Sequence, residues 1–225
     1  MMIRLDILQP IACYRIPEIG NPMLSFPIVP PATVYGLLRY ITGYLSINKD
    51  NTRLAISGKY EGKARHIVIN HQTTQGDKGK YKSNKVPIEE LYNISHFIHV
   101  DSPYEKEIVS SIHNVQRMGR REDVIIHVSC CEVEIAKKDV IDISLTKIIN
   151  NDANLYVPFN HQIHGIGIFK VPIDSDKALL DDGYLKMYYK RLLFMDVPKY
   201  YSVSNEIVVS KDKEGNTHVL CWLNE

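Results

Sequence analysis

Apolar and polar side chains alternate along the first residues of the chain. Ile3, Leu5 and Ile7 are separated by charged residues, and a period of two predicts a strand with one buried face. Proline and glycine are then frequent from residue 17 to residue 31, which is typical of an irregular surface segment. The chain is therefore expected to open with a half-buried strand and a loop.

A helix is predicted directly after this loop. Pro30 and Pro31 precede it, and proline is tolerated in a first helical turn because its missing N–H has no partner there. Tyr35, Arg39 and Thr42 form a polar and aromatic stripe on one side of this helix. The other side is an apolar stripe that is expected to face the core, and it consists of Val34, Leu37, Leu38, Ile41 and Leu45.

Further elements follow from residue 57 onward. Strands are predicted over 65–69 and 94–100, with a lysine-rich segment, 73–85, between them. A serine, a proline and a glutamate in the order of a capping box open a second helix over 102–119, which a glycine is placed to end. Another strand is predicted over 123–135, and short strand-like stretches continue to the C-terminus.

The predicted order β, α, β, β, α, β is the split pattern of ferredoxin-like and RNA-recognition folds. In these folds two helices cover one face of a four-stranded antiparallel sheet. We therefore predict an α+β protein with a ferredoxin-like (RRM-like) βαββαβ domain over 1–138. The segment around 66–100 could be a long hairpin or two paired strands with a mobile loop projecting from them, and a smaller β-rich region follows over 139–225. A short helix is predicted within that region, over 184–193.

Composition and charge narrow the function. The 225 residues are 44% hydrophobic, and 27 Lys and Arg face 26 Asp and Glu. These proportions are those of a globular protein, and the near-zero charge excludes a globally basic nucleic-acid binder, so that only local patches remain. No apolar stretch is long enough for a membrane span, and the charged N-terminus is no signal peptide. We expect a cytoplasmic protein.

The cysteines and histidines do not predict a metal site. The four cysteines show no C-x-x-C spacing, and neighbours such as Cys130 and Cys131 point to opposite faces of a strand. The same argument separates His96 from His99 if both lie on a strand. His161 and His164 lie in a loop without a carboxylate or cysteine to complete a set. We predict no metal and no cofactor.

An arginine-rich string is the most informative short segment. Arg117, Arg120 and Arg121 surround Gly119, and guanidinium groups grip phosphate oxygens in pairs and stack on bases. The same string ends with two carboxylates, and arginines near the end of a helix also complement its dipole. Residue types alone therefore leave a phosphate site and a neutral structural loop as equal alternatives.

The lysine-rich segment is compatible with single-stranded nucleic acid. Lys78, Lys80 and Lys82 could follow phosphates, while Tyr81 offers a stacking surface for a base. A solvated loop tip explains the same composition.

Three strings together resemble the CRISPR-associated family called Cas five, of the RAMP superfamily. Residues 26–38 resemble its P-P-x-T-x-x-G-L-L helix start, and residues 10–17 resemble the end of its first strand, with an aromatic–arginine pair before a proline. Residues 119–124 resemble its G-R-x-E-D-hydrophobic string. Tyr14 replaces a phenylalanine and Ala32 a small hydroxyl residue. The likeness covers roughly the first 135 residues.

The resemblance implies a subunit of a type I Cascade complex, of subtype I-B or a near relative. Such a subunit holds the 5′ handle of the CRISPR RNA, caps the backbone filament and contacts the backbone and large subunits, with no membrane involved. Segment 73–85 and its flanking strands would be its β-hairpin thumb, and Gly36 would allow close approach. The residues expected to bind RNA are Tyr14, Arg15, Tyr35, Arg39, Lys78, Lys80, Lys82, Arg117, Gly119, Arg120 and Arg121.

An alternative is a metal-independent endoribonuclease that cleaves the CRISPR repeat, as in the I-C branch. That chemistry needs a base on the 2′-hydroxyl, and Tyr35, Lys82 and His113 are conceivable candidates. No spacing singles them out, so a non-catalytic RNA-binding role is preferred.

Overall fold

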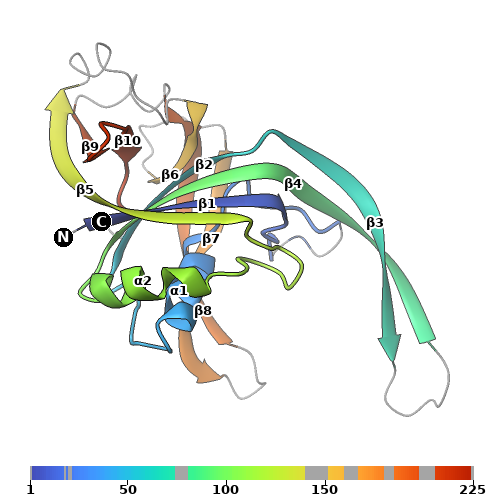
Figure 1. Cartoon of the computed structure of the whole chain (residues 1–225). Helices are drawn as coiled ribbons and strands as arrows, with labels where there is room; N and C mark the ends of the chain where they lie inside the picture. The colour runs from blue at the N-terminus through green and yellow to red at the C-terminus, as the bar shows by residue number, and fades with distance from the viewer. Residues whose placement is uncertain are drawn as a thin grey trace.

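Ten strands form one sheet in the computed structural model (Figure 1). The structure describes the following residues: 2–17, 19, 22–73, 81–139, 152–159, 167–179, 185–197 and 206–223. The elements are β1 (Met2–Ala12), α1 (Pro31–Ile41), β2 (Arg53–Lys59), β3 (Gly62–Thr73), β4 (Tyr81–Asp101), α2 (Glu105–Ser111), the 3-10 turn η1 (Ile112–Asn114), β5 (His127–Asp139), β6 (Asn154–Pro158), β7 (Gly167–Leu179), β8 (Leu185–Asp196), β9 (Glu206–Asp212) and β10 (Thr217–Leu220).

The N-terminal half of the chain supplies the middle of the sheet. Strands β5, β1, β4 and β2 lie side by side in this order and are antiparallel throughout. Figure 1 shows α1 and α2 on the same side of these strands. The C-terminal strands extend the sheet at both ends, because β9 and β10 follow β5 while β6, β8 and β7 follow β2. The protein is α+β with an antiparallel sheet and few helices, as predicted.

One hairpin leaves the body of the sheet. Strand β3 pairs only with β4, from Gly62 opposite Tyr92 to Thr73 opposite Tyr81, and Figure 1 shows this β3–β4 hairpin projecting far from the helices. The rest of β4 lies between β1 and β2 in the centre of the sheet. The predicted strands over 65–69 and 94–100 are therefore parts of this hairpin and of its base.

Strand β2 was not predicted from the sequence. Its residues from Leu54 to Gly58 are all buried, so polar and apolar positions do not alternate, and alternation is the signal by which a strand is recognised. The helix expected over 184–193 is also wrong, because β8 spans these residues and pairs with both β6 and β7. Pairing with two neighbours outweighs a local helical pattern here.

The second helix is shorter than predicted. Ser102 and Glu105 do form the expected local contacts, since the Ser102 hydroxyl accepts from the Tyr104 N–H and Glu105 accepts from the Ser102 N–H. After η1 the backbone is extended at Val115. Gly119 lies beyond the helix, in a loop, where it has a positive φ of 112°.

Buried histidines lie on both faces of β4. His96 faces the helix side, where its Nε2 lies 2.8 Å from the Tyr14 hydroxyl. His99 faces the other side, where its Nε2 lies 2.7 Å from the Ser210 hydroxyl and its ring is 5.9 Å from that of His218. The expected separation of His96 and His99 is confirmed. Burial lowers the pKa of His96 and of His218 to about 3.

We expect acid to destabilise the protein through these rings. The unfolded histidines have a pKa of about 6.5 and bind protons below it, whereas the folded rings stay neutral down to a pH of about 3. Because the unfolded state binds these protons and the folded state does not, the free energy of unfolding falls by roughly 2 kcal/mol per buried histidine when the pH drops from 7 to 5. Urea unfolding at both pH values measures this loss. In His218→Gln the loss of unfolding free energy between pH 7 and pH 5 should be smaller by about 2 kcal/mol. In His113→Gln, where the histidine is exposed, the loss should equal that of the wild type. Equal losses in the wild type and both variants would show that the buried histidines do not cause the acid sensitivity.

Candidate nucleic-acid interface

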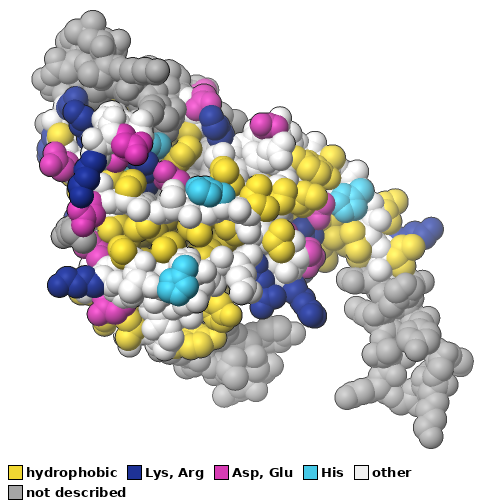
Figure 2. Space-filling view, viewed as in Figure 1, with side chains coloured by type: hydrophobic (Ala, Val, Ile, Leu, Met, Phe, Trp, Pro, Cys, Tyr) yellow, Lys and Arg dark blue, Asp and Glu magenta, His cyan; other side chains and the backbone are white. Residues whose placement is uncertain are grey.

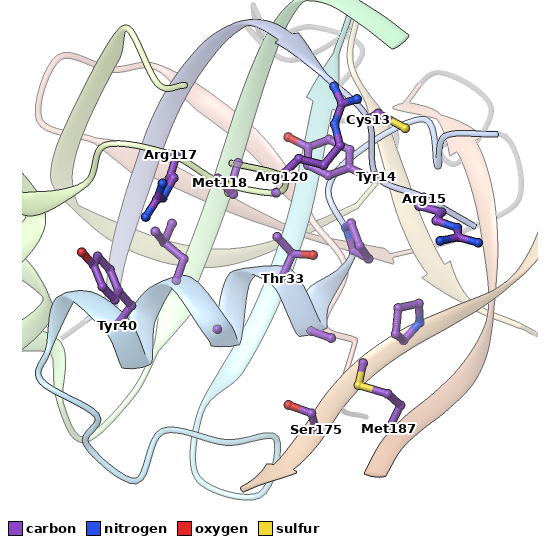
Figure 3. Close-up of a pocket in the computed structure, with 16 residues that line it drawn as sticks. Cys13, Tyr14, Arg15, Thr33, Tyr40, Arg117, Met118, Arg120, Ser175 and Met187 are labelled. Carbon is purple, nitrogen blue, oxygen red and sulfur yellow. The ribbon is translucent and has the colours of Figure 1, made fainter. Parts of the chain in front are cut away.

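Three separate stretches of the chain meet around one cavity of about 600 Å³. They are the end of β1, the exposed side of α1 and the loop from residue 117 to residue 120, and two strands of the C-terminal half close the cavity (Figure 3). Its size is that of a ligand-binding cleft. The predicted residues among those that line it are Tyr14, Arg15, Gly36, Arg117, Gly119 and Arg120.

Tyr14 forms a wall of this cavity rather than a free stacking surface. Its side chain is 3% exposed, and its hydroxyl donates to Gln9 Oε1 at 2.5 Å and lies against His96. Burial raises the pKa of Tyr14 well above its usual value, and burial also raises the pKa of the neighbouring Cys13 thiol to about 11. Both groups therefore stay protonated at neutral pH, and neither is a ready base or nucleophile.

The arginine-containing loop is attached to β1 by a buried carboxylate. Asp123 is fully buried, and its Oδ2 accepts from the backbone N–H of Arg120 at 2.8 Å and from that of Cys13 at 3.4 Å. The Gln9 amide donates to the carbonyls of Met118 and Asp123 at 2.9 and 3.0 Å. The loop is thus held in one conformation by groups that are themselves buried.

Arg120 belongs to this support. Its guanidinium donates to Asp123 Oδ1 at 2.7 Å and to Glu90 Oε1 at 2.6 Å. Burial lowers the pKa of Arg120, but the hydrogen bonds to Asp123 and Glu90 outweigh it and the pKa lies above the usual value. Because two carboxylates occupy the guanidinium, Arg120 positions the loop, and the loop's other arginines are the ones available to an RNA.

The side of α1 that faces the cavity differs from the polar stripe chosen from the sequence. Tyr35 is fully buried and donates to the Thr52 carbonyl at 2.7 Å. Arg39 is 9% exposed and donates to Asp174 of β7 at 2.5 Å. Strand β7 covers this stripe, and the spacing of residues within α1 carries no information about a strand more than 130 residues away. Tyr35 and Arg39 are therefore not placed to contact RNA.

The cavity face of α1 is formed instead by residues four apart, Ala32, Gly36 and Tyr40. Tyr40 is 53% exposed and presents an aromatic ring of the kind on which bases stack. A Cβ added to Gly36 would have no atom within 4 Å, so no packing within the protein requires a glycine there. Tyr40 was missed from the sequence, although its spacing from Gly36 could have identified it.

Three of the predicted arginines remain exposed: Arg15, Arg117 and Arg121. No ion pair joins them to any residue that the structure describes. Figure 3 shows Arg117 beside Tyr40 at one end of the cavity and Arg15 at the other. Lys78 and Lys80 lie outside the described residues, and Lys82 is placed only through its backbone, opposite Gln72 in the β3–β4 hairpin.

Neither a metal cluster nor a membrane-spanning helix is present in the described part of the chain. No group of three or more His, Cys, Asp or Glu side chains there is arranged to hold a metal ion. No helix there is long and apolar enough to cross a membrane.

Comparison with known proteins identifies the fold. No family model and no curated protein matches the sequence. Among solved structures, the chain is similar to one from a "CRISPR RNA-guided surveillance complex", with a TM-score of 0.53 and 10% identity over 87% of this chain and 90% of that one. The protein therefore has the fold of a CRISPR surveillance-complex subunit, and the resemblance noted in the sequence is confirmed at this level.

Two further solved structures align over most of their length. One is a CRISPR protein from Archaeoglobus fulgidus, with a TM-score of 0.41 and 14% identity over 98% of this chain and 99% of that one. The other is from the Type III-B Cmr-beta complex bound to cognate target RNA and AMPPnP, with a TM-score of 0.41 and 14% identity over 87% and 84%.

Two glycines at the cavity should respond oppositely to alanine. Gly36→Ala should raise the unfolding free energy by about 0.5–1 kcal/mol, because glycine is unfavourable inside a helix and the added methyl meets no atom. Gly119→Ala should lower it by about 1–3 kcal/mol, because φ is +112° and the new Cβ would lie 2.7 Å from Asp123 Oδ2. Chemical denaturation of both variants measures these changes, and a loss of stability in Gly36→Ala would show that the helix face is not open.

Proposed function

We propose that this protein is a non-catalytic RNA-binding subunit of a type I CRISPR interference complex (Cascade), acting in antiviral defence. It holds the 5′ handle of the guide RNA and caps one end of the backbone filament. The single observation that carries the proposal is the convergence of residues 13–15, 30–40 and 117–120 on one cavity. Residues 13–15, 30–37, 119 and 120 of this lining belong to the three strings on which the family resemblance depends, and the fold over 87% of the chain agrees with it.

The cavity has the chemistry that a single-stranded RNA requires. Arg15 and Arg117 lie at its two ends (Figure 3), and guanidinium groups bind phosphate oxygens in a bidentate manner. Tyr40, at the same end of the cavity as Arg117, offers a ring for one unstacked base. Gly36 leaves the backbone of α1 open to close approach. A strand that enters past one arginine and leaves past the other would place its bases against α1.

Arg121 adds a third positive group at the edge of this site. It lies outside the lining of the cavity but within four residues of Arg117. We assign it to the RNA backbone as the strand leaves the cavity. The RNA-binding role expected of Lys78, Lys80 and Lys82 is part of this proposal.

The architecture supports the same assignment. We interpret β1–α1–β2–β4–α2–β5 as the ferredoxin-like unit of a RAMP protein, spanning residues 1–138, with residues 139–225 as its β-rich C-terminal part. The β3–β4 hairpin would be the thumb. Ile67 and Ile69 are 63% and 52% exposed on it, and exposed apolar side chains on a projecting hairpin suit contact with a protein partner. The backbone and large subunits of Cascade, in a prokaryotic cytoplasm, are the proposed partners.

Removing the free arginines should weaken RNA binding and its salt dependence together. Arg117→Gln combined with Arg121→Gln should lower affinity for the single-stranded handle segment of the cognate repeat RNA. The slope of log K against log[salt] should fall by about 0.7 for each lost phosphate contact. Filter binding or fluorescence anisotropy over a range of salt concentrations measures both.

A matched control uses two exposed lysines away from this cavity. Lys106→Gln combined with Lys211→Gln removes the same charge, and since both lysines are exposed and neither lines the proposed RNA cavity, it should leave the salt slope unchanged. If the slope of log K against log[salt] falls equally in the control and in the arginine variant, RNA binding depends on the overall charge of the protein and not on this cavity. An unchanged slope in the arginine variant would refute the proposed site.

Repeat cleavage remains the alternative function, although its candidate residues do not converge. Tyr35 is fully buried, Lys82 lies in the distal half of the hairpin, and His113 is exposed in η1. We expect no specific cleavage when the pure protein is incubated with its repeat RNA in EDTA. Products cut at one position, visible by denaturing electrophoresis, would establish the endoribonuclease instead.

A further inference from the structure

Half of β5 has a free edge. Strand β5 pairs with β1 over residues 127–133, and with β9 over residues 133–139. From His127 to Glu132 no strand of the described chain pairs with its second side. The N–H and C=O groups that point outward there are a template for another strand. This stretch contains no proline and no lysine, and its one carboxylate, Glu132, lies 3.2 Å from Lys213 of the turn between β9 and β10.

The free edge lies within a cavity of about 770 Å³. Side chains from both faces of β5, Ser129 and Cys130 among them, line this cavity together with α2 and the turn between β9 and β10. Side chains of opposite faces can share a cavity only where the sheet ends between them. Figure 2, viewed as Figure 1, shows hydrophobic side chains gathered between β5 and α2.

A buried arginine with an unused donor lines the same cavity. Arg4 is 4% exposed, and its guanidinium donates to Asp6 at 2.7 and 2.9 Å and to Asp212 at 3.1 Å. Its Nη1 has no hydrogen-bond partner within the described chain. This Nη1 is itself shielded from solvent, so Arg4 contributes to the wall of the cavity through its ion pairs with Asp6 and Asp212.

Strand β9 shows how a segment binds to this edge. It pairs antiparallel with β5 as far as Asp212 opposite Val133. There the Asp212 carboxylate accepts from the backbone N–H groups of Glu214 and Asn216 at 3.0 and 2.8 Å, and the chain turns away into β10. An incoming strand would continue the line of β9 past the point where β9 leaves β5.

The side chains around the edge specify the pattern of the incoming strand. On the helix side Val109 is 40% exposed beside the half-buried Cys130, so apolar residues fit there. On the other side lie Ser129 and the Arg4 guanidinium, which suit a small polar residue or a carbonyl. Because successive strand residues face opposite sides, the partner would alternate apolar and small polar residues.

We propose that residues 127–132 of β5 are a docking site for an extended segment of another polypeptide, which adds a strand to the sheet and alternates apolar and small polar residues. The site is separate from the RNA cavity and does not depend on the proposed function. Acidic and basic residues are nearly balanced around it, so backbone pairing and apolar contact, rather than charge, would select the partner.

A synthetic peptide of alternating valine and serine, with lysines at both ends for solubility, tests the site in the full chain. Saturating peptide should slow amide hydrogen exchange in residues 127–132 and leave other exposed strands unchanged. Methylation of alternate peptide nitrogens should abolish this protection, because it removes the hydrogen bonds that pair strands. Val109→Glu should weaken binding about tenfold, since it places a charge on the apolar side of the site.

Ile135→Glu is the matched control. Ile135 is 44% exposed on the same strand, but it is paired with Ser210 of β9 and lies outside the cavity, so binding should change less than twofold. An unchanged melting temperature in Val109→Glu would separate lost binding from lost folding. The proposal fails if the amides of residues 127–132 gain no protection from exchange, or if the methylated peptide protects them equally. It also fails if their protection rises with protein concentration in the absence of peptide, because the occupant would then be a second copy of the chain. None of these outcomes bears on RNA binding.

Discussion

The buried carboxylate of Asp123 is the group on which the cavity proposed to bind RNA depends. It accepts hydrogen bonds from the backbones of Cys13 and Arg120 and from the Arg120 guanidinium, and so joins the end of β1 to the loop that carries Arg117. A fully buried charge is tolerated only when its partners are complete, and removing one partner of such a pair costs about 3–5 kcal/mol. The loop therefore has one conformation, in which Arg117 is exposed at the cavity while Arg120 is paired with Asp123 and Glu90.

The arginines of this protein divide into two groups by their surroundings. Arg4, Arg39 and Arg120 are buried or half-buried against carboxylates, where they connect distant strands and loops. Arg15 and Arg117 are exposed at the cavity, and these two can meet a phosphate. The near-zero net charge of the chain hides this division, because a net charge does not distinguish paired, buried arginines from exposed ones.

The C-terminal strands shape both proposed sites. Strand β7 covers the polar stripe of α1 and closes the RNA cavity through Pro172 and Ser175. Strand β9 covers half of β5 and leaves the other half open at Asp212. Both surfaces thus arise where the C-terminal part of the chain meets the N-terminal part. A shorter chain with the same central strands would have neither surface in this form.

The sequence by itself determined the features that depend on neighbouring residues. Alternation in β1, the prolines before α1 and the glycine with positive φ at position 119 were all evident from local spacing, and so were the three strings that resemble a known family. These signals are local because strand pleat, helix period and backbone strain act over a few residues. They were enough to place Arg15 and Arg117 among the candidates and to predict an α+β fold.

Only the tertiary structure decided which side chains are covered. Tyr35 and Arg39 share a helix with Tyr40, yet Tyr35 is buried against Thr52 and Arg39 against Asp174 of β7, while Tyr40 stays open. Arg120 and Arg117 are three residues apart, yet Glu90 of β4 occupies only Arg120. Strand β2 was missed because both its faces are buried. Burial and pairing are set by segments far away in the chain, and no local pattern of residues contains them.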